Sequence, residues 1–76
     1  MAAAKVTAKE IVQRLRDSGY SDGQIAYEMQ RFLPGGSIPS LNSIRRWRYG
    51  KAEPSNTYAV VLEMLYLDVS SRGLLE

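Results

Sequence analysis

Four basic side chains lie close together near the middle of the chain, and such a cluster is suited to binding an anion. The stretch that contains them, residues 39–52, has no acidic residue, whereas acidic residues outnumber basic ones in the remainder of the chain. The formal net charge of +2 therefore arises in this one stretch. A polyanion that approaches the protein is attracted to this stretch first. The four residues are Arg45, Arg46, Arg48 and Lys51.

The residues around this cluster predict a short helix over residues 40–49. Leu41, Ile44 and Trp47 recur at a spacing of three and form an apolar stripe along such a helix. Ser40 precedes the stripe as an N-cap residue does, and a glycine follows the helix, as at many helix ends. The helix therefore presents one face to a protein core and a second, polar and basic face to a ligand.

The polar face of this helix has side chains of the types that read base pairs in double-stranded DNA. A helix fits the major groove, where its first residues reach the base edges. The amide of Asn42 is suited to a bidentate pair with adenine, the guanidinium of Arg46 to one with guanine, and Leu41 to a thymine methyl group. Two alternatives stay open. Leu41 lies one turn before Ile44 and is equally suited to the core, and a run of charges is usually a solvated surface.

The composition limits the chemistry that the chain can perform. Its 76 residues allow a single domain, and they include no cysteine and no histidine. Disulfide bonds, cysteine-based zinc sites and histidine-based catalysis are therefore excluded. The acidic residues show no paired spacing beyond that of a helix surface, and the chain has no glycine-rich phosphate loop. We therefore expect no enzyme activity, no cofactor, no metal ion and no small-molecule substrate.

Two features of the chain bear on its location in the cell. No apolar run approaches the roughly 20 residues that a membrane-spanning helix needs. The N-terminal residues lack the apolar core of a signal peptide. We therefore expect a cytoplasmic protein that makes no contact with a membrane.

Three further helices are predicted from apolar residues at helical spacing: the first two follow the N-cap residues Thr7 and Ser21, and the last starts at Pro54 or Ser55. Together with the basic helix they define an all-α fold in one domain, residues 1–76, with its core over about residues 7–67 and a short C-terminal tail over residues 68–76. Residues 30–39 contain two prolines and two glycines and are expected to form an irregular loop. The three further helices span about residues 7–17, 21–33 and 54–67.

Two runs of residues carry a resemblance to a known family, namely Gln24-Ile25-Ala26 and Ser43-Ile44-Arg45-Arg46-Trp47-Arg48-Tyr49-Gly50-Lys51-Ala52-Glu53-Pro54-Ser55. The chain resembles the lambda-repressor-like helix-turn-helix domains, also called the Cro or XRE family, over about residues 7–67. The second run is similar to the family's order of a polar residue, Ile, two polar residues, Trp or Leu, two polar residues, Gly-Lys, two variable residues and Pro-Ser. In the family a tight turn joins the second and third helices, whereas residues 30–39 add an extra segment here.

The resemblance implies a small all-α, lambda-repressor-like domain of four to five helices. It also implies a sequence-specific transcriptional regulator of the phage or bacterial repressor type, which binds double-stranded DNA in a bacterial or phage-infected cell. Residues 40–49 are then the recognition helix. By position, the family's base contacts fall on Leu41, Asn42, Ser43, Arg45 and Arg46, and its phosphate contacts fall on Ser21, Gln24, Ser40, Arg48, Tyr49 and Lys51.

The fourth predicted helix is apolar around more of its circumference than one core face requires. A single recognition helix reads only half a site and gives little specificity at cellular salt. We therefore expect a homodimer on a palindromic operator, with its two recognition helices about 34 Å apart. The fourth helix and the C-terminal tail, with Leu74 and Leu75, are the expected interface.

Two other interpretations of the same residues stay open. One is a protein-interaction module, such as an antitoxin or a phage adaptor, that keeps the helical fold and binds a partner through the fourth helix. The other lies within DNA binding, because residues 44–51 also resemble the recognition helix of excisionase and MerR-type winged helices. Those proteins continue into a β-wing, whereas residues 54–67 are predicted to form a helix.

Overall fold

The computed structural model describes residues 6–33, 35 and 38–73, and within them it contains four helices and no strand. The all-α class predicted from the sequence is therefore confirmed for the described residues, and they contain no β-wing. None of the four helices is long and apolar enough to cross a membrane. The helices are α1 (Ala8–Asp17), α2 (Asp22–Gln30), α3 (Leu41–Arg48) and α4 (Asn56–Ser71).

All four helices begin directly after a serine or threonine N-cap residue. In each case the side-chain oxygen accepts a hydrogen bond from the backbone N–H three residues later, which satisfies one donor that the first turn leaves unpaired. Such a cap stabilises a helix by about 1 kcal/mol. The four helix starts are therefore set locally. The N-cap residues are Thr7, Ser21, Ser40 and Ser55.

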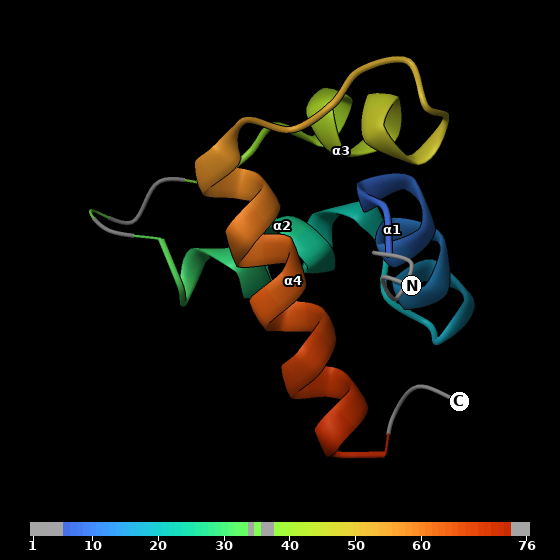
Figure 1. Cartoon of the computed structure of the whole chain (residues 1–76), viewed down its shortest axis with the longest axis vertical. Helices are drawn as coiled ribbons and strands as arrows, with labels where there is room; N and C mark the ends of the chain where they lie inside the picture. The colour runs from blue at the N-terminus through green and yellow to red at the C-terminus, as the bar shows by residue number, and fades with distance from the viewer. Residues whose placement is uncertain (1–5, 34, 36–37, 74–76) are drawn as a thin grey trace, which may run out of the picture.

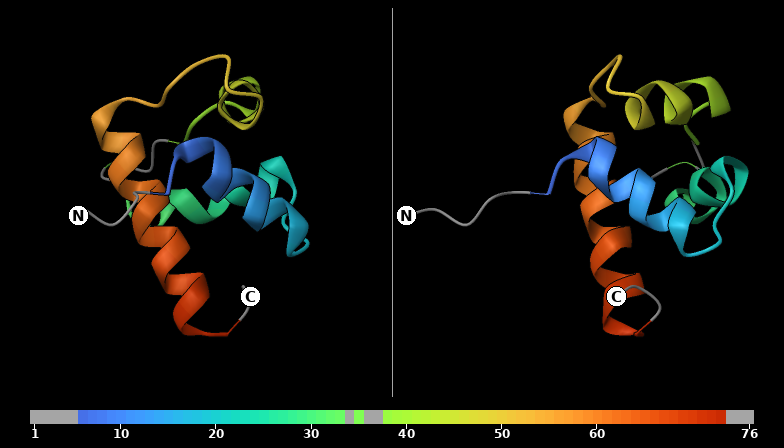
Figure 2. Two further views of the ribbon diagram at one scale, coloured as in Figure 1. Left: turned by 45° about the vertical axis from the view of Figure 1, so that its right-hand side comes forward. Right: turned by 90° about the vertical axis from the view of Figure 1, so that its right-hand side faces the viewer.

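The helices α1 and α2 form a platform that carries the other two. Each of them contacts both α3 and α4, and α1 and α2 also contact one another. The longest helix, α4, runs down one side of this platform, and α3 crosses above it near the N-terminal end of α4 (Figure 1). The same order is seen from the two directions of Figure 2. Both α3 and α4 therefore keep one face turned away from the rest of the protein.

The core consists of apolar side chains from all four helices and from the loop after α2. No polar or charged residue is classed as buried among the described residues. The core therefore derives its stability from apolar contact. Its buried members are Ile11, Val12, Leu15, Ile25, Ala26, Met29, Leu33, Ile44, Trp47, Val61, Leu62, Leu65 and Val69.

The ends of two helices differ from the prediction. The prediction placed the end of α2 at residue 32 or 33, but α2 ends at Gln30, because the next three N–H groups bond to carbonyls three residues back in a tighter turn. The prediction placed residues 68–76 in a tail, but α4 continues to Ser71, with Val69 fully buried and Arg72 ion-paired with Asp68 at 2.7 Å. The core therefore extends beyond residue 67.

Candidate nucleic-acid interface

The helix α3 is divided into a buried face and an exposed face, as the sequence predicts. Ile44 and Trp47 are buried, and the Trp47 ring lies 5.7 Å from the ring of Tyr58, centroid to centroid. Asn42 and both arginines that precede Trp47 are exposed. The packing of one face therefore fixes which side chains the other face presents.

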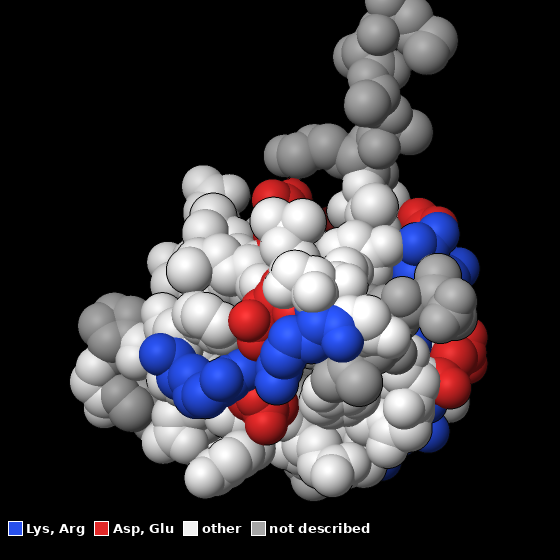
Figure 3. Space-filling model, turned by 90° about the horizontal axis from the view of Figure 1, so that it is seen from below, with Lys and Arg blue, Asp and Glu red and all other residues white. Residues whose placement is uncertain are grey.

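The two arginines of the exposed face, Arg45 and Arg46, have no ion-pair or hydrogen-bond partner for their side chains among the described residues. Arginines elsewhere have acidic partners: Arg31, which follows α2, pairs with Glu28 and Asp68, and Arg72 also pairs with Asp68. Figure 3 views the molecule from the side opposite to α3, and basic and acidic side chains lie next to one another there. Among the described residues, the arginines without an acidic partner are therefore both on α3.

Leu41 lies at the junction of α2 and α3, and half of its surface is open. It is 52% exposed, and its Cδ2 atom lies 3.9 Å from the position that a Cβ atom on Gly23 would take. The first turn of α2 therefore meets the first turn of α3. The sequence left open whether Leu41 belongs to the core or to a ligand-binding face. One side of it lies against α2, and the remainder is exposed to solvent.

The hydroxyl groups of Ser40 and Ser43 bind to each other. The Ser40 Oγ accepts a hydrogen bond from the Ser43 backbone N–H at 3.1 Å and donates one to the Ser43 Oγ at 3.0 Å. Ser43 is half-buried, whereas its neighbour Asn42 is exposed. These two serines therefore stabilise the start of α3, and the Asn42 side chain between them is exposed to solvent.

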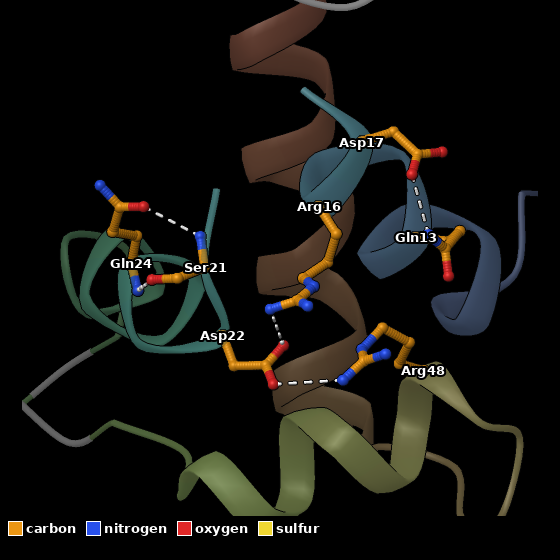
Figure 4. A network of polar contacts seen from close by, with 7 residues as sticks. All are labelled: Gln13, Arg16, Asp17, Ser21, Asp22, Gln24 and Arg48. Atoms are coloured by element: carbon orange, nitrogen blue, oxygen red, sulfur yellow. Dashed lines mark hydrogen bonds and ion pairs between the residues drawn. The ribbon is translucent and has the colours of Figure 1, made fainter. Parts of the chain in front are cut away.

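Ser21 and Gln24, two of the predicted phosphate contacts, form a capping box at the start of α2. The Ser21 Oγ accepts from the Gln24 N–H at 3.1 Å, and the Ser21 N–H donates to Gln24 Oε1 at 2.9 Å (Figure 4). Both residues remain exposed. The Gln24 side-chain amide nitrogen takes no part in the capping box, so it remains available as a hydrogen-bond donor.

Arg48 differs from the prediction, because it does not belong to the exposed basic face. Its guanidinium lies 3.4 Å from the Asp22 carboxylate (Nη2 to Oδ2) and packs over the ring of Tyr49, 4.6 Å from the centroid. Both side chains of the ion pair are only 13% exposed. Burial lowers the pKa of Arg48, but its contacts with Tyr49 and Asp22 outweigh burial and raise this pKa above the usual arginine range. Arg48 therefore stays charged, and its guanidinium is already paired with the carboxylate of Asp22.

The C-terminal end of α3 forms a Schellman motif that places Tyr49 and Lys51 on the surface. The Gly50 N–H donates to the Trp47 carbonyl, the Lys51 N–H donates to the Arg46 carbonyl, and Gly50 has φ +74°. Tyr49 and Lys51 are both exposed. The two predicted phosphate contacts that follow α3 are therefore accessible beside its free arginines.

Lys9, on α1, is a cation that sequence reasoning missed at this surface. Its side chain lies against Gly50: a Cβ atom on that glycine would be 3.5 Å from Lys9 Cδ and 3.8 Å from Nζ. An ammonium group at this place also stabilises the negative end of the α3 dipole. Nothing in the local sequence around Lys9 signals this contact, since it depends on how α1 packs against α3.

Comparison of the chain with protein-family models, with curated proteins and with solved structures gave no match. The described residues contain no group of three or more acidic side chains arranged to hold a metal ion, and the sequence has no histidine or cysteine. The distinguishing chemistry of the described surface is therefore the set of accessible cations and amides on and around α3.

Proposed function

We propose that this chain is a sequence-specific, double-stranded DNA-binding transcriptional regulator of the phage or bacterial repressor type, with a lambda-repressor-like helix-turn-helix architecture. The observation that carries the proposal is the exposed face of α3. It presents Asn42, Arg45 and Arg46 to solvent, and neither arginine has a partner for its side chain among the described residues. The opposite face of α3 is anchored in the core, so these side chains are held on a fixed support.

The proposed complex has α3 in the major groove with its first two turns against the base edges. With its side chains, an α-helix is about 10–12 Å in diameter, which fits the major-groove width of about 12 Å. Asn42 and Arg46 pair with adenine and guanine, and the open side of Leu41 contacts a thymine methyl group. Around α3, the phosphates are held by Tyr49, Lys51, the Gln24 amide and Lys9, none of which carries base specificity.

The exposed face of α4 supports the second part of the proposal, a homodimer on a palindromic operator. Val60, Met64 and Leu67 are 56%, 43% and 66% exposed and follow one another at spacings of four and three, so they form one stripe. The other exposed residues of α4, Asn56, Thr57 and Ser71, are uncharged. A two-fold contact places like residues opposite one another, and a stripe without charge avoids repulsion there. Leu74 and Leu75, also expected in this interface, lie outside the described residues.

Selection from a randomised pool of duplex DNA, repeated at two salt concentrations, tests the proposal. We expect one palindromic motif with half-sites about one helical turn apart, and an affinity that falls steeply as salt rises. Binding that occurs only at low salt and enriches no motif contradicts sequence-specific recognition. Binding to a single half-site with monomers at micromolar concentration in sedimentation contradicts the homodimer alone.

The stripe on α4 also favours a second candidate function, a protein-interaction module that binds a different protein through α4. In that case the cations of α3 are a solvated surface. Two variants distinguish the two candidate functions. Replacing Arg45 and Arg46 by Ala leaves a partner complex intact under the second candidate and removes DNA retention under the first, whereas Met64→Lys disrupts the partner complex.

A further inference from the structure

The segment between α2 and α3 is long, so the angle between the two helices must be fixed by contacts outside this segment. Residues 31–40 join the two helices in place of a tight turn, and a connection of this length imposes little geometry on its ends. The helices α2 and α3 nevertheless pack against one another, with Gly23 near Leu41 at the start of α3. At the end of α3, Arg48 forms an ion pair with Asp22 of the first turn of α2. This packing and this ion pair constrain the angle between the two helices.

The Asp22 carboxylate joins three helices at one point. Its Oδ2 atom lies 3.4 Å from Arg48 Nη2 of α3, and its Oδ1 atom lies 3.5 Å from Arg16 Nη1 of α1. Figure 4 shows the carboxylate between the two guanidinium groups, with α3 passing below. The carboxylate accepts a hydrogen bond from Arg48, whereas its Oδ1 atom has no hydrogen-bond partner among the described residues and attracts Arg16 by charge alone. A single side chain of the first turn of α2 therefore lies between α1 and α3, with the stronger contact to α3.

The charges of this group are unequal, because two cations share one anion. Arg16 is 36% exposed and can be solvated, whereas the Arg48 and Asp22 side chains are only 13% exposed. The Arg48 Nε atom is buried and has no hydrogen-bond partner, so the Asp22 carboxylate is the main compensation for this guanidinium. Without the carboxylate, two like charges would face one another across the α1–α3 junction. Arg48 is then expected to turn outward, toward the surface where Arg45 and Arg46 lie.

We infer that Asp22 is a positioning residue for DNA recognition: it holds α3 at the angle at which its first turns read bases, and it keeps Arg48 from binding phosphate. This inference rests on the proposed function. An acidic residue lowers the net positive charge of the interface and is expected to weaken binding to DNA in general. Here it is expected to improve the discrimination between DNA sequences.

The variant Asp22→Asn tests the inference, because it removes the charge and keeps the shape of the side chain. We expect the affinity for a non-specific duplex to rise and its salt dependence to steepen by about one phosphate contact, because Arg48 becomes available. We expect the ratio of specific to non-specific affinity to fall by about tenfold, as when one base contact is lost. Loss of folding alone would lower both affinities, and thermal unfolding followed by circular dichroism identifies that case.

Two matched variants separate positioning from charge. Asp17→Asn makes the same charge change at an exposed α1 residue that accepts a hydrogen bond from the Gln13 side chain. We expect it to leave the affinity ratio unchanged. Asp22→Glu keeps the charge and moves the carboxylate, so we expect it to lower the ratio without raising non-specific affinity. A folded Asp22→Asn protein with the wild-type ratio, or a fall in the ratio with Asp17→Asn as large as with Asp22→Asn, overturns the inference.

The Arg48 Nε–H signal in proton–nitrogen spectra gives a measurement that is independent of DNA. We expect slow exchange with solvent in the wild-type protein and fast exchange in Asp22→Asn. Slow exchange in both proteins would show that Arg48 stays buried without the Asp22 carboxylate, which overturns the inference. If the wild-type protein shows no sequence preference while the signal behaves as expected, the proposed function and the positioning role both fail, whereas the contact between the two side chains stands.

Discussion

The helices α3 and α4 are alike on their buried faces and opposite on their exposed faces. Both begin after a serine N-cap, and both are held by α1 and α2. Outward, α3 presents amide and guanidinium groups, whereas α4 presents Val60, Met64 and Leu67. A chain of 76 residues thus has one polar and one apolar surface on separate helices. The difference teaches that exposed residues, which the fold does not need, are the ones that indicate function.

The largest expected effect is a loss of stability when a buried side chain of α3 is removed. We expect Trp47→Ala to lower the free energy of unfolding by about 3–5 kcal/mol, because the cavity left beside Tyr58 cannot be filled. Urea denaturation followed by circular dichroism measures the change. Tyr49→Ala, which removes an exposed aromatic ring two residues after Trp47, is the control and should cost much less. Similar losses for the two variants would show that α3 is not anchored through Trp47.

The exposed face of α3 is tested by Arg46→Ala. We expect the affinity for the selected duplex to fall by about 1–3 kcal/mol and the preference at one base pair to relax, with the free energy of unfolding unchanged. Fluorescence anisotropy with labelled duplexes measures both effects. Arg72→Ala makes the same charge change at the far end of α4, where the arginine is already paired with Asp68. An equal loss in the two variants would mean that only net charge matters.

The exposed face of α4 is tested by Met64→Lys at the middle of the stripe. We expect self-association at micromolar concentration to be lost, because a two-fold contact would bring two ammonium groups together, whereas stability changes by about 0.5 kcal/mol or less. Sedimentation velocity gives the association state. Gln13→Lys adds the same charge on α1 and should leave the dimer intact. A dimer that survives Met64→Lys would place the interface away from this stripe.

The smallest expected effects concern two glycines that take the same substitution with opposite results. A Cβ atom on Gly23 would make ordinary contacts at 3.8 and 3.9 Å, so Gly23→Ala should stabilise α2 by about 0.5–1 kcal/mol. Gly50 has φ +74°, and Gly50→Ala should cost about 1–2 kcal/mol. Thermal unfolding compares the two variants. Two shifts of the same sign would contradict the assignment of Gly50 as the C-terminal cap of α3.

The parts of the fold that follow from neighbouring residues could be predicted from the sequence, and those that depend on packing could not. The starts of the helices follow from serine and threonine residues that cap the first turn. The buried face of α3 follows from the spacing of Ile44 and Trp47. The pairing of Arg48 with Asp22 joins residues 26 positions apart, so no local pattern signals it. Val69 lies in a run that interrupts the apolar pattern, and its burial depends on how α4 packs against the other helices.

Trp47 gives the protein an internal optical probe, because it is the only tryptophan in the chain. Its indole is buried under α3 and close to Tyr58, so its emission reports on a single helix. Exposure of the indole to water shifts this emission to longer wavelength. Fluorescence and circular dichroism, recorded on one unlabelled sample, therefore distinguish a loosened α3 from an unfolded domain. Each variant can be sorted in this way before any DNA is added.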